Sequence, residues 1–330
     1  MPEKLLKVKD LKKYFPFRRG ILKRPTGHVK AVDGVSFDIY KGETLGIVGE
    51  SGSGKSTMAR TILRLLEPTA GEILFGGHDI GKATNQELRS YRKDMQLIFQ
   101  DPYSSLNPRF SVQKIIEEPL TVQTGISKQE RTTRVIEMLE KVGLSEDART
   151  KFPHEFSGGQ RQRIGIARAL ATNPKFIIGD EPVSALDVSV QAQVLNLMKD
   201  LQEEFDLTYL FIAHDLSVVK HISDRVGVMY LGRLVEIGPK QAIYEDPLHP
   251  YTQALLSAVP RTKIEKRRER IQLVGEPPNP ANPPSGCPFH TRCPLAFDHC
   301  KVERPELVEQ KDGRSVACHL YKGNSVVINN

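Results

Sequence analysis

The sequence has 330 residues and a mass of 37.0 kDa, which predicts a core domain with an appendage. Hydrophobic residues make up 39% and charged residues 26%, and the mean hydropathy is -0.36, a composition that supplies a sizeable core and excludes an integral membrane protein. No run approaches the roughly 18 apolar residues of a spanning helix, and charges interrupt the first leucines. We therefore expect a cytosolic chain without a secretory signal.

The net charge of +7 is concentrated in two segments. Residues 1–30 carry ten Lys or Arg against two acidic residues, and residues 261–270 carry six against two. Such runs either face the phosphates of nucleic acid or of an anionic membrane surface, or form an ordinary solvated surface. We favour the solvated surface for each run.

Apolar patterning in chain order predicts an α/β fold. Residues 35–40 alternate as a strand does, residues 43–49 indicate a strand that enters a glycine-rich loop, and a helix is expected from residue 55 to about 66. Further strands are predicted at 96–99, 175–179 and 209–213, with helices at 128–142, 160–171 and 190–205. Strands that alternate with helices in this way favour a parallel sheet.

Two segments depart from that alternation. Residues 85–156 are more helical and polar, which predicts a helical insertion between two halves of the sheet domain. Seven of the 22 prolines lie between Pro277 and Pro294, which predicts an extended stretch that is not a core element.

Residues 49–57, Gly-Glu-Ser-Gly-Ser-Gly-Lys-Ser-Thr, match the phosphate-loop pattern G-x-x-x-x-G-K-[ST]. Glycines allow a tight turn whose backbone N–H groups point inward, and the following helix N-terminus attracts anions. We expect Lys55 to reach the β- and γ-phosphates of ATP and Ser56 to bind Mg²⁺. The predicted nucleotide-binding residues of this loop are Gly49, Ser51, Gly52, Ser53, Gly54, Lys55, Ser56 and Thr57.

A pair of carboxylates follows the apolar strand predicted at 175–179. Asp180 stands at the carboxyl end of the strand, where it can hold Mg²⁺ through water. Glu181 follows directly and can polarise an attacking water. The two residues are candidates for metal binding and for the catalytic base.

Several short motifs then resemble those of ATP-binding-cassette (ABC) ATPases. Phe-Ser-Gly-Gly-Gln at residues 156–160 is similar to the LSGGQ signature, with Phe where Leu is usual. Gln100 stands at a Q-loop position, Ser-Ala-Leu-Asp at residues 184–187 resembles a D-loop, and His214 resembles the switch histidine. The order and spacing of these motifs are specific, and the resemblance covers residues 5–245.

The resemblance implies a P-loop NTPase fold with a RecA-like parallel-sheet core, an antiparallel β subdomain, a helical subdomain and a C-terminal metal-cluster extension. It implies four segments: residues 1–85 with the phosphate loop, 86–160 with the Q-loop and signature, 161–245 with Asp180, the D-loop and His214, and 246–330 as the extension.

The resemblance also implies a head-to-tail dimer in which the signature of one subunit covers ATP held by the other. Ser157 is suited to cap a helix whose first N–H groups form a second anion site. The residues expected at that shared site are Ser157, Gly158, Gly159, Gln160 and Asp187. His214 is expected to contact the γ-phosphate and orient Glu181, and Gln100 is expected to contribute to catalysis and Mg²⁺ binding. Tyr14 is the expected adenine platform, with Phe15 as the alternative.

Residues 100–109 and 247–256, together with the tail, look like the oligopeptide/dipeptide importer branch, and the Tyr-Ser-Ser after Asp101-Pro102 resembles its F-type subunit. This implies an ATPase at the cytoplasmic face of the inner membrane. Its implied partners are a D-type ATPase, or a second copy in isolation, two permeases and, indirectly, an extracytoplasmic peptide-binding protein. Nickel, glutathione or an oligosaccharide stay open as cargo. A cassette ATPase acting on nucleic acid or ribosomes is the alternative class, but its usual second cassette or long coiled coil is absent from the sequence, so we expect no nucleic-acid partner.

The four cysteines lie in the last 44 residues with the spacing C-x5-C-x6-C-x17-C. Disulfides are disfavoured in a reducing cytosol, and zinc sites usually contain a C-x₂₋₄-C pair. Members of the importer branch carry a [4Fe–4S] cluster, so Cys287, Cys293, Cys300 and Cys318 are expected to bind one. Zn²⁺ is the first alternative and unligated thiols are the second.

Overall fold

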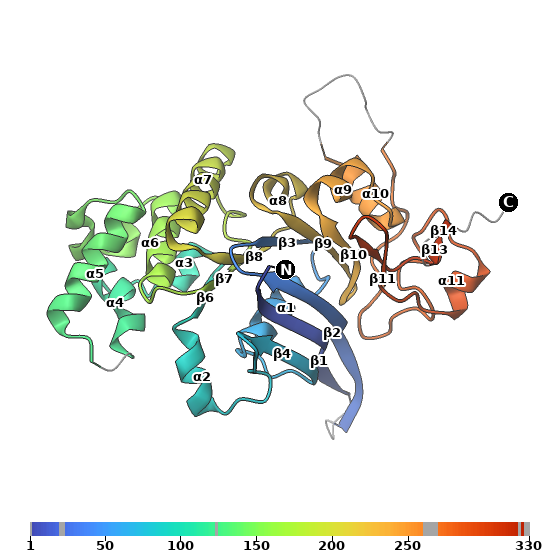
Figure 1. Cartoon of the computed structure of the whole chain (residues 1–330), viewed down its shortest axis with the longest axis horizontal. Coiled ribbons are helices and arrows are strands. Elements are labelled where there is room, and N and C mark those ends of the chain that lie inside the picture. Colours follow the sequence, from blue (N-terminus) through green and yellow to red (C-terminus); the bar gives the residue numbers. More distant parts are fainter. Residues whose placement is uncertain (1, 20–23, 123–124, 260–269, 323–324, 327–330) are drawn as a thin grey trace. The chain divides into compact units, whose positions relative to one another are not determined.

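The computed structural model describes residues 2–19, 24–122, 125–259, 270–322 and 325–326 (Figure 1). The chain forms two compact units, and each is assembled from separate stretches of sequence. Unit 1 contains Met1–Glu3, Ile39–Thr44 and Lys82–Ile212, and unit 2 contains Lys4–Asp38, Leu45–Gly81 and Ala213–Asn330. Of the basic run at 261–270, all but Arg270 lie outside the described residues.

Unit 1 contains three parallel strands, with β7 between β8 and β6. They are β6 (Met95–Ile98), β7 (Phe176–Asp180) and β8 (Thr208–Ile212). Every residue of β7 and β8 is buried, as expected for strands of a parallel sheet that is covered on both faces. The strands predicted at 96–99, 175–179 and 209–213 are therefore confirmed to within one residue at each end.

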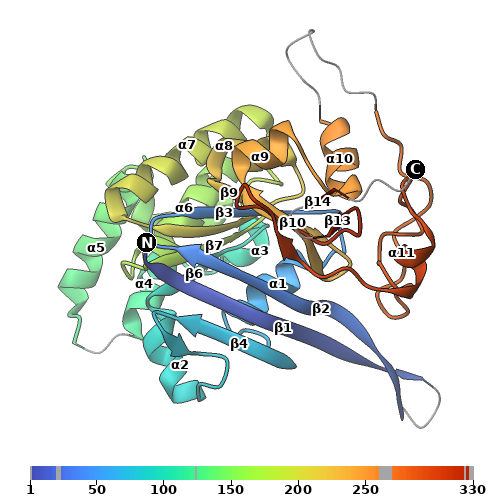
Figure 2. The same cartoon turned by 45° about the vertical axis from the view of Figure 1, so that its right-hand side comes forward.

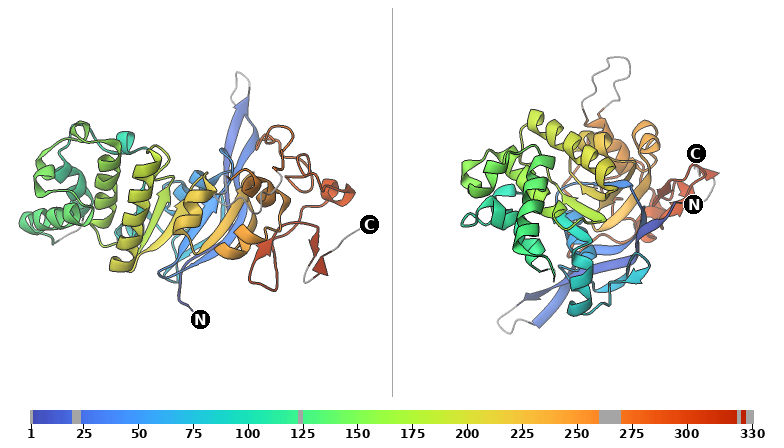
Figure 3. Two further views of the ribbon diagram at one scale, coloured as in Figure 1. Left: turned by 90° about the horizontal axis from the view of Figure 1, so that it is seen from above. Right: turned by 60° about the vertical axis from the view of Figure 1, so that its left-hand side comes forward.

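The helices of unit 1 include a group in which α4, α5 and α6 pack against one another, seen together in Figures 1 and 3. Helix α5 begins where predicted because Ser127 and Glu130 form a capping box at its first turn. The unit comprises α2 (Asn85–Arg92), α3 (Pro102–Ser105), α4 (Val112–Thr121), α5 (Lys128–Lys141), α6 (Gly158–Leu170) and α7 (Val188–Phe205), with 3₁₀ turns at Glu146–Thr150 and Pro153–Glu155.

Unit 2 contains a four-stranded sheet in the order β2-β1-β4-β5, whose long strands β1 and β2 run side by side in Figure 2. The pairs β1–β4 and β4–β5 are antiparallel, as the resemblance implied for a β subdomain. The alternate residues Leu6 and Val8 of β1 are buried, so one face of this strand packs into the core. The strands are β1 (Lys4–Arg19), β2 (Arg24–Tyr40), β4 (Ala70–Phe75) and β5 (His78–Asp79).

A second group of strands in unit 2 has the order β11-β12-β10-β9-β3. Strand β9 is parallel to β3 and antiparallel to β10, and β10 also pairs with β12 from the tail. The tail is therefore joined to this unit by backbone hydrogen bonds. The strands are β3 (Thr44–Val48), β9 (Arg225–Tyr230), β10 (Arg233–Pro239), β11 (Val308–Glu309) and β12 (Ser315–Val316), and a hairpin joins β13 (Tyr321–Lys322) to β14 (Ser325–Val326).

The helices of unit 2 are α1 (Lys55–Ile62), α8 (Leu216–Ile222), α9 (Lys240–Glu245), α10 (Pro250–Ser257) and α11 (Asp298–Val302). The helix predicted from residue 55 to 66 ends earlier because Arg64 adopts a left-handed conformation, with φ 54°. The N–H groups of Leu65 and Leu66 then bond back to the carbonyl oxygen of Arg60 and close the helix.

The proline-rich stretch contains no helix or strand between Pro277 and Pro294, as predicted. One part of that prediction is wrong, however, because Phe289 from this stretch is a core residue with 1% of its surface exposed. Its ring lies 5.3 Å from that of Tyr230 and 5.4 Å from that of Tyr251. Among the described residues, no helix combines the length and apolar character needed to cross a bilayer.

Candidate functional site

The phosphate loop of unit 2 connects the buried strand β3 to helix α1. The Lys55 ammonium group folds back into the loop, where Nζ donates to the carbonyl oxygens of Gly49 and Glu50 at 2.8 and 3.1 Å. The Lys55 side chain is buried, so its charge is held within a ring of backbone. Because phosphate oxygens are stronger acceptors than carbonyl oxygens, a bound polyphosphate can replace these contacts.

Two glycines of the loop have no room for a side chain. A Cβ at Gly49 would lie 2.1 Å from the carbonyl oxygen of Met229, and one at Gly54 would lie 2.1 Å from that of Ala31. Gly54 also has φ 102°, a conformation that L side chains rarely adopt. The neighbouring atoms are backbone and cannot rotate away, so the path of the loop depends on both glycines.

The predicted adenine platform, Tyr14, is fixed by a polar cluster in unit 2. Its hydroxyl donates to Oδ1 of Asp33, and the other carboxylate oxygen accepts from Arg233 at 2.9 Å and from Arg304 at 3.0 Å. Burial, followed by the hydrogen bond to Asp33, raises the pKa of Tyr14 to about 12. The ring is thus held as a neutral phenol, whereas the alternative, Phe15, is exposed.

The two carboxylates predicted for chemistry lie at the end of β7 in unit 1. Asp180 is the last residue of the strand and is buried. Glu181 adopts φ 51°, which is uncommon for a residue other than glycine, and its N–H donates to the carbonyl oxygen of Ile212 at 2.9 Å. Its Oε2 accepts a hydrogen bond from Nε2 of Gln100 at 3.0 Å. The fold therefore brings two predicted catalytic residues together.

The signature segment begins α6 in unit 1. Ser157 and Gln160 form a capping box, with the Gln160 N–H donating to the Ser157 hydroxyl and the Ser157 N–H donating to Gln160 Oε1. A Cβ at Gly159 would lie 2.4 Å from Cγ1 of Val190 on α7, whereas one at Gly158 would make an ordinary contact. Ser157 and Gly158 are exposed, so the first turn of this 13-residue helix is open to an anion.

The remaining predicted residues occupy loops and helix starts. Asp187 immediately precedes α7 and makes no side-chain cap to it, and the Ser184 hydroxyl donates to the carbonyl oxygen of Glu181 at 3.0 Å. His214 is exposed in the connection that leads to α8 and belongs to unit 2, as do Ser56 and Thr57 of α1. Gln100, the signature and the D-loop belong to unit 1.

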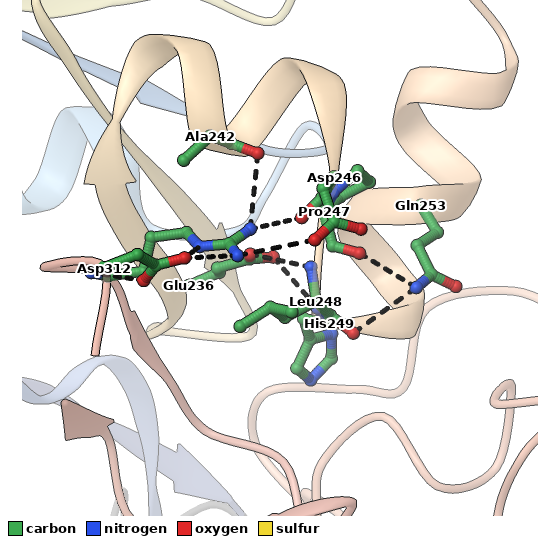
Figure 4. A network of polar contacts seen from close by, with 9 residues as sticks. Glu236, Ala242, Asp246, Pro247, Leu248, His249, Gln253 and Asp312 are labelled. Atoms are coloured by element: carbon green, nitrogen blue, oxygen red, sulfur yellow. Dashed lines mark hydrogen bonds and ion pairs between the residues drawn. The ribbon is translucent and has the colours of Figure 1, made fainter. Parts of the chain in front are cut away.

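The segment that follows α9 is anchored by a buried carboxylate, shown in Figure 4. Glu236 accepts hydrogen bonds from the N–H groups of Leu248 and His249 at 2.8 and 3.0 Å. Nδ1 of His249 in turn accepts from the N–H of Tyr251 at 3.0 Å and caps α10. Complete burial lowers the pKa of His249 to about 3, so the imidazole is neutral and can serve as this acceptor.

The tail contributes Arg314 to the same network. Its guanidinium donates to the carboxylate of Asp312 and to the carbonyl oxygens of Ala242 and Asp246. The last two contacts cap the end of α9, where unpaired carbonyl groups favour a cation. The segment that resembles the importer branch, residues 247–256, contacts β10 through the hydrogen bonds of Glu236 and contacts the tail through the rings of Tyr251 and Phe289.

Two known protein families match separate segments of the chain. The ABC transporter family matches residues 32–184, and the family described as oligopeptide/dipeptide transporter, C-terminal region, matches residues 235–300. The chain is 61% identical over 322 residues to the oligopeptide transport ATP-binding protein AppF of Bacillus subtilis, which covers 97% of this chain and 98% of the relative. The chain belongs to the ATP-binding subunits of ABC transporters.

Further comparisons agree with this membership. The dipeptide transport ATP-binding protein DppF of Escherichia coli is 52% identical over 318 residues, covering 96% of this chain and 95% of the relative. An ATP-binding cassette solved as a dimer with ADP and phosphate has a TM-score of 0.63 and 32% identity, covering 71% of this chain and 98% of that one. The cassette cbiO1 of Clostridium perfringens has a TM-score of 0.63 and 29% identity, covering 74% and 92%. This ABC subunit is accordingly an ATPase with the P-loop cassette fold.

The cysteines of this ABC subunit line one small cavity in unit 2. Apolar Phe289, Leu295 and Leu320 lie in the same wall, together with the four residues Cys287, Cys293, Cys300 and Cys318. Among the described residues, no group of three or more His, Cys, Asp or Glu side chains is arranged to hold a metal ion. The described residues therefore support neither the expected metal-cluster extension nor the zinc alternative.

One contact at the phosphate loop was not predicted from the sequence. Nη1 and Nη2 of Arg292 donate to Oε2 and Oε1 of Glu50 at 2.8 and 3.2 Å. The two residues are 242 positions apart, and Glu50 occupies an unspecified position of the loop pattern. Nothing in the local sequence of either residue predicts the other.

Proposed function

We propose that this ATPase supplies the energy for an importer of dipeptides or oligopeptides, acting peripherally at the cytoplasmic face of the inner membrane. The observation that carries the proposal is similarity over nearly the whole chain, tail included, to two proteins named for oligopeptide and dipeptide transport. A cassette that resembled transport ATPases only in its core would leave the cargo open.

In this proposal the phosphate loop binds the phosphates of ATP, with Lys55 at the β- and γ-phosphates. Ser56 and Gln100, with Asp180 acting through water, hold Mg²⁺, which neutralises phosphate charge. Glu181 polarises the attacking water, and His214 orients it. Support comes from the buried Lys55 ammonium group, the position of Asp180 at the end of a parallel strand, and the hydrogen bond between Gln100 and Glu181.

ATP also joins two cassettes in this proposal. The exposed first turn of α6, with Ser157, Gly158, Gly159 and Gln160, covers the γ-phosphate of ATP held by the other subunit, and Asp187 lies in the same interface. Support comes from the open N-terminus of α6 and from the related cassette solved as a dimer with ADP and phosphate. Closing on ATP and opening after hydrolysis converts chemistry into motion.

Tyr14 stacks on the adenine in this proposal. A planar ring fixed in one orientation loses little entropy when a base stacks on it. The hydrogen bond to Asp33 provides that fixation, and Phe15 has no comparable polar anchor because it lacks a hydroxyl group.

The partners in the membrane are two permease subunits, paired with this chain and a D-type ATPase, and a peptide-binding protein delivers cargo outside. The contact with the permeases follows Gln100, so that nucleotide state and permease motion are coupled through that segment. Tyr103, three residues further on, exposes 67% of its surface and is available for such a contact.

The four cysteines bind a [4Fe–4S] cluster in this proposal, with a structural role. Support comes from the four cysteines, which line the wall of one cavity and supply the number of thiols that such a cluster requires. A cluster also needs a wider cage than a single zinc ion, whose Zn–S distances are about 2.3 Å. Burial raises the pKa of Cys287 to about 11, and a bound cluster would hold that thiol as a thiolate.

Reconstitution tests the proposed function. The chain, the partner ATPase and the two permeases are placed in proteoliposomes with the binding protein, and uptake of labelled dipeptide and release of phosphate are measured together. We expect both to require ATP, and the Lys55→Ala variant to lose both. Transport of nickel or glutathione without transport of peptide would show that peptides are not the cargo. A rate of ATP hydrolysis that does not change when the loaded binding protein is added would reject the coupling role.

A further inference from the structure

Glu50 introduces a negative charge into a loop that must bind a polyanion. It is the only acidic residue of the phosphate loop at positions 49–57. Its carbonyl oxygen accepts from Lys55 Nζ at 3.1 Å, so the orientation of this residue also affects the lysine. An unmatched carboxylate in this loop would repel a bound triphosphate, because like charges at close range raise each other's free energy.

Arg292 matches that charge with a bidentate ion pair. Both terminal nitrogens of its guanidinium reach the carboxylate, at 2.8 and 3.2 Å, and the Arg292 side chain is only 7% exposed. The Glu50 side chain is 27% exposed and faces this buried partner. Bidentate pairs fix geometry as well as charge, so the carboxylate is held on the side of the loop where the tail packs.

The arginine is itself held by packing. It follows Phe289 in a turn in which the Arg292 N–H donates to the carbonyl oxygen of Phe289 at 3.0 Å. Phe289 is buried against Tyr230, and the guanidinium carbon of Arg292 lies 6.0 Å from the centre of the Tyr230 ring. The guanidinium therefore loses little freedom when it pairs with Glu50.

The backbone of Glu50 is fixed by the same layer of residues. Its N–H donates to the hydroxyl of Tyr251 at 3.0 Å, and Tyr251 is completely buried with its ring 4.7 Å from that of Tyr230. The tail also approaches the loop at Pro277 and Pro278, which line a cavity of about 450 Å³ with Ser51. Glu50 therefore has a partner for its N–H, its carbonyl oxygen and its side chain. The partner of the side chain, Arg292, comes from the tail.

We propose that Arg292 is a positioning residue for ATP binding, which holds Glu50 to the tail side of the phosphate loop and cancels its charge. The inference rests on the proposed nucleotide site. It makes the C-terminal extension part of the ATP-binding machinery of this subunit, whether or not the extension also binds a cluster.

Breaking the ion pair from its two sides distinguishes this role from a structural one. Arg292→Gln leaves the carboxylate uncompensated and should weaken ATP binding roughly tenfold. Glu50→Gln leaves the positive charge of Arg292 unmatched beside the phosphate loop and should strengthen ATP binding. A structural role predicts that both variants weaken binding, because both lose the same contact. Calorimetric titration of the full-length protein with ATP, ADP and adenosine measures the difference.

Three further results are expected if the role is electrostatic. The loss in Arg292→Gln should be larger for ATP than for ADP and absent for adenosine, and it should shrink at high salt. Arg292→Lys should restore most of the affinity, and the double variant Arg292→Gln/Glu50→Gln should bind ATP about as tightly as the wild type. Lys301→Gln is the matched control, because it breaks an exposed tail ion pair with Asp298 and should change nothing.

The outcomes distinguish failure of the proposed nucleotide site from failure of the proposed role of Arg292. If Lys55→Ala binds ATP like the wild type, the proposed nucleotide site is wrong. If Lys55→Ala loses ATP while Arg292→Gln binds normally, or while Glu50→Gln also weakens binding, the nucleotide site stands and the role of Arg292 is rejected. Glu50→Gln decides the sign of the effect even if Arg292→Gln fails to fold.

Discussion

Nε2 of Gln100 lies 3.0 Å from Oε2 of Glu181, although 81 positions separate the two residues in the sequence. Gln100 follows strand β6 and Glu181 follows β7, and the two strands are parallel neighbours, so their carboxyl ends meet at one edge of unit 1. The Gln100 amide donates to one oxygen of this carboxylate. The residue that precedes the proposed permease contact thus touches the residue proposed to activate the water.

The first prediction concerns Glu181. Glu181→Gln keeps the shape and the hydrogen-bonding capacity of the side chain but removes its basicity, so ATP binding should persist while turnover falls roughly 10²- to 10⁴-fold. Without hydrolysis the ATP-bound dimer should accumulate. Phosphate release and size-exclusion chromatography with ATP test both effects, and wild-type turnover in the variant would reject Glu181 as the base.

The second prediction concerns the signature glycines. Gly159→Ala places a methyl group 2.4 Å from Cγ1 of Val190, so α6 and α7 must separate at a cost of about 1–3 kcal/mol in the free energy of unfolding. Gly158→Ala, with its nearest contact at 3.5 Å, is the matched control and should be much less costly. Adding Val190→Ala to Gly159→Ala should restore stability. Equal urea midpoints for the two glycine variants would contradict the contact.

The third prediction concerns adenine. Tyr14→Ala should weaken ATP binding, whereas Tyr14→Phe keeps the ring and should retain most of the affinity despite losing the hydrogen bond to Asp33. Phe15→Ala serves as the comparison. Quenching of a fluorescent ATP analogue measures all three, and a larger loss in Phe15→Ala than in Tyr14→Ala would assign the platform to Phe15.

The fourth prediction concerns pH. The pKa of His249 is about 3 in the folded protein and 6.5 in a model peptide, so below pH 6.5 the unfolded chain takes up a proton that the folded chain does not. Its contribution to stability is complete above pH 6.5 and is lost as the pH falls toward 3. His249→Asn retains an acceptor for the Tyr251 N–H but has no group that takes up a proton in this range. When the pH falls from 7 to 5, the free energy of unfolding of the variant should therefore decrease by about 2 kcal/mol less than that of the wild type.

Urea unfolding at the two pH values measures that difference. The exposed His154 provides a control, since His154→Asn should follow the wild type at both pH values. Parallel behaviour of His249→Asn and the wild type would show that the buried imidazole does not determine the acid response.

The fifth prediction concerns the cysteines. Protein purified without oxygen should be brown, and Cys287→Ser or Cys300→Ser should lose the colour. Iron and sulfide analysis provides the stoichiometry. A colourless wild type that contains one equivalent of zinc would overturn the cluster, and a protein without metal would leave four free thiols.

The sequence alone predicted the local parts of the site. The phosphate loop, the capped start of α6 and the carboxylates after β7 each depend on a few adjacent residues. The glycines, capping residues and apolar runs that form these parts can be identified directly in the sequence. The chain order of these motifs also predicted the family, which the comparisons confirmed. The end of α1 was less accurate, because the left-handed turn at Arg64 has no glycine to mark it.

Only the tertiary structure decided which distant residues meet. The contacts of Glu50 with Arg292, of Gly159 with Val190 and of Tyr14 with Asp33 join residues from different elements. Phe289 also became a core residue inside a proline-rich stretch. Periodicity and motif spacing indicate the local secondary structure of a segment. The partner of a side chain depends on how whole strands and helices pack, and that packing is determined by the burial of surface over the entire unit.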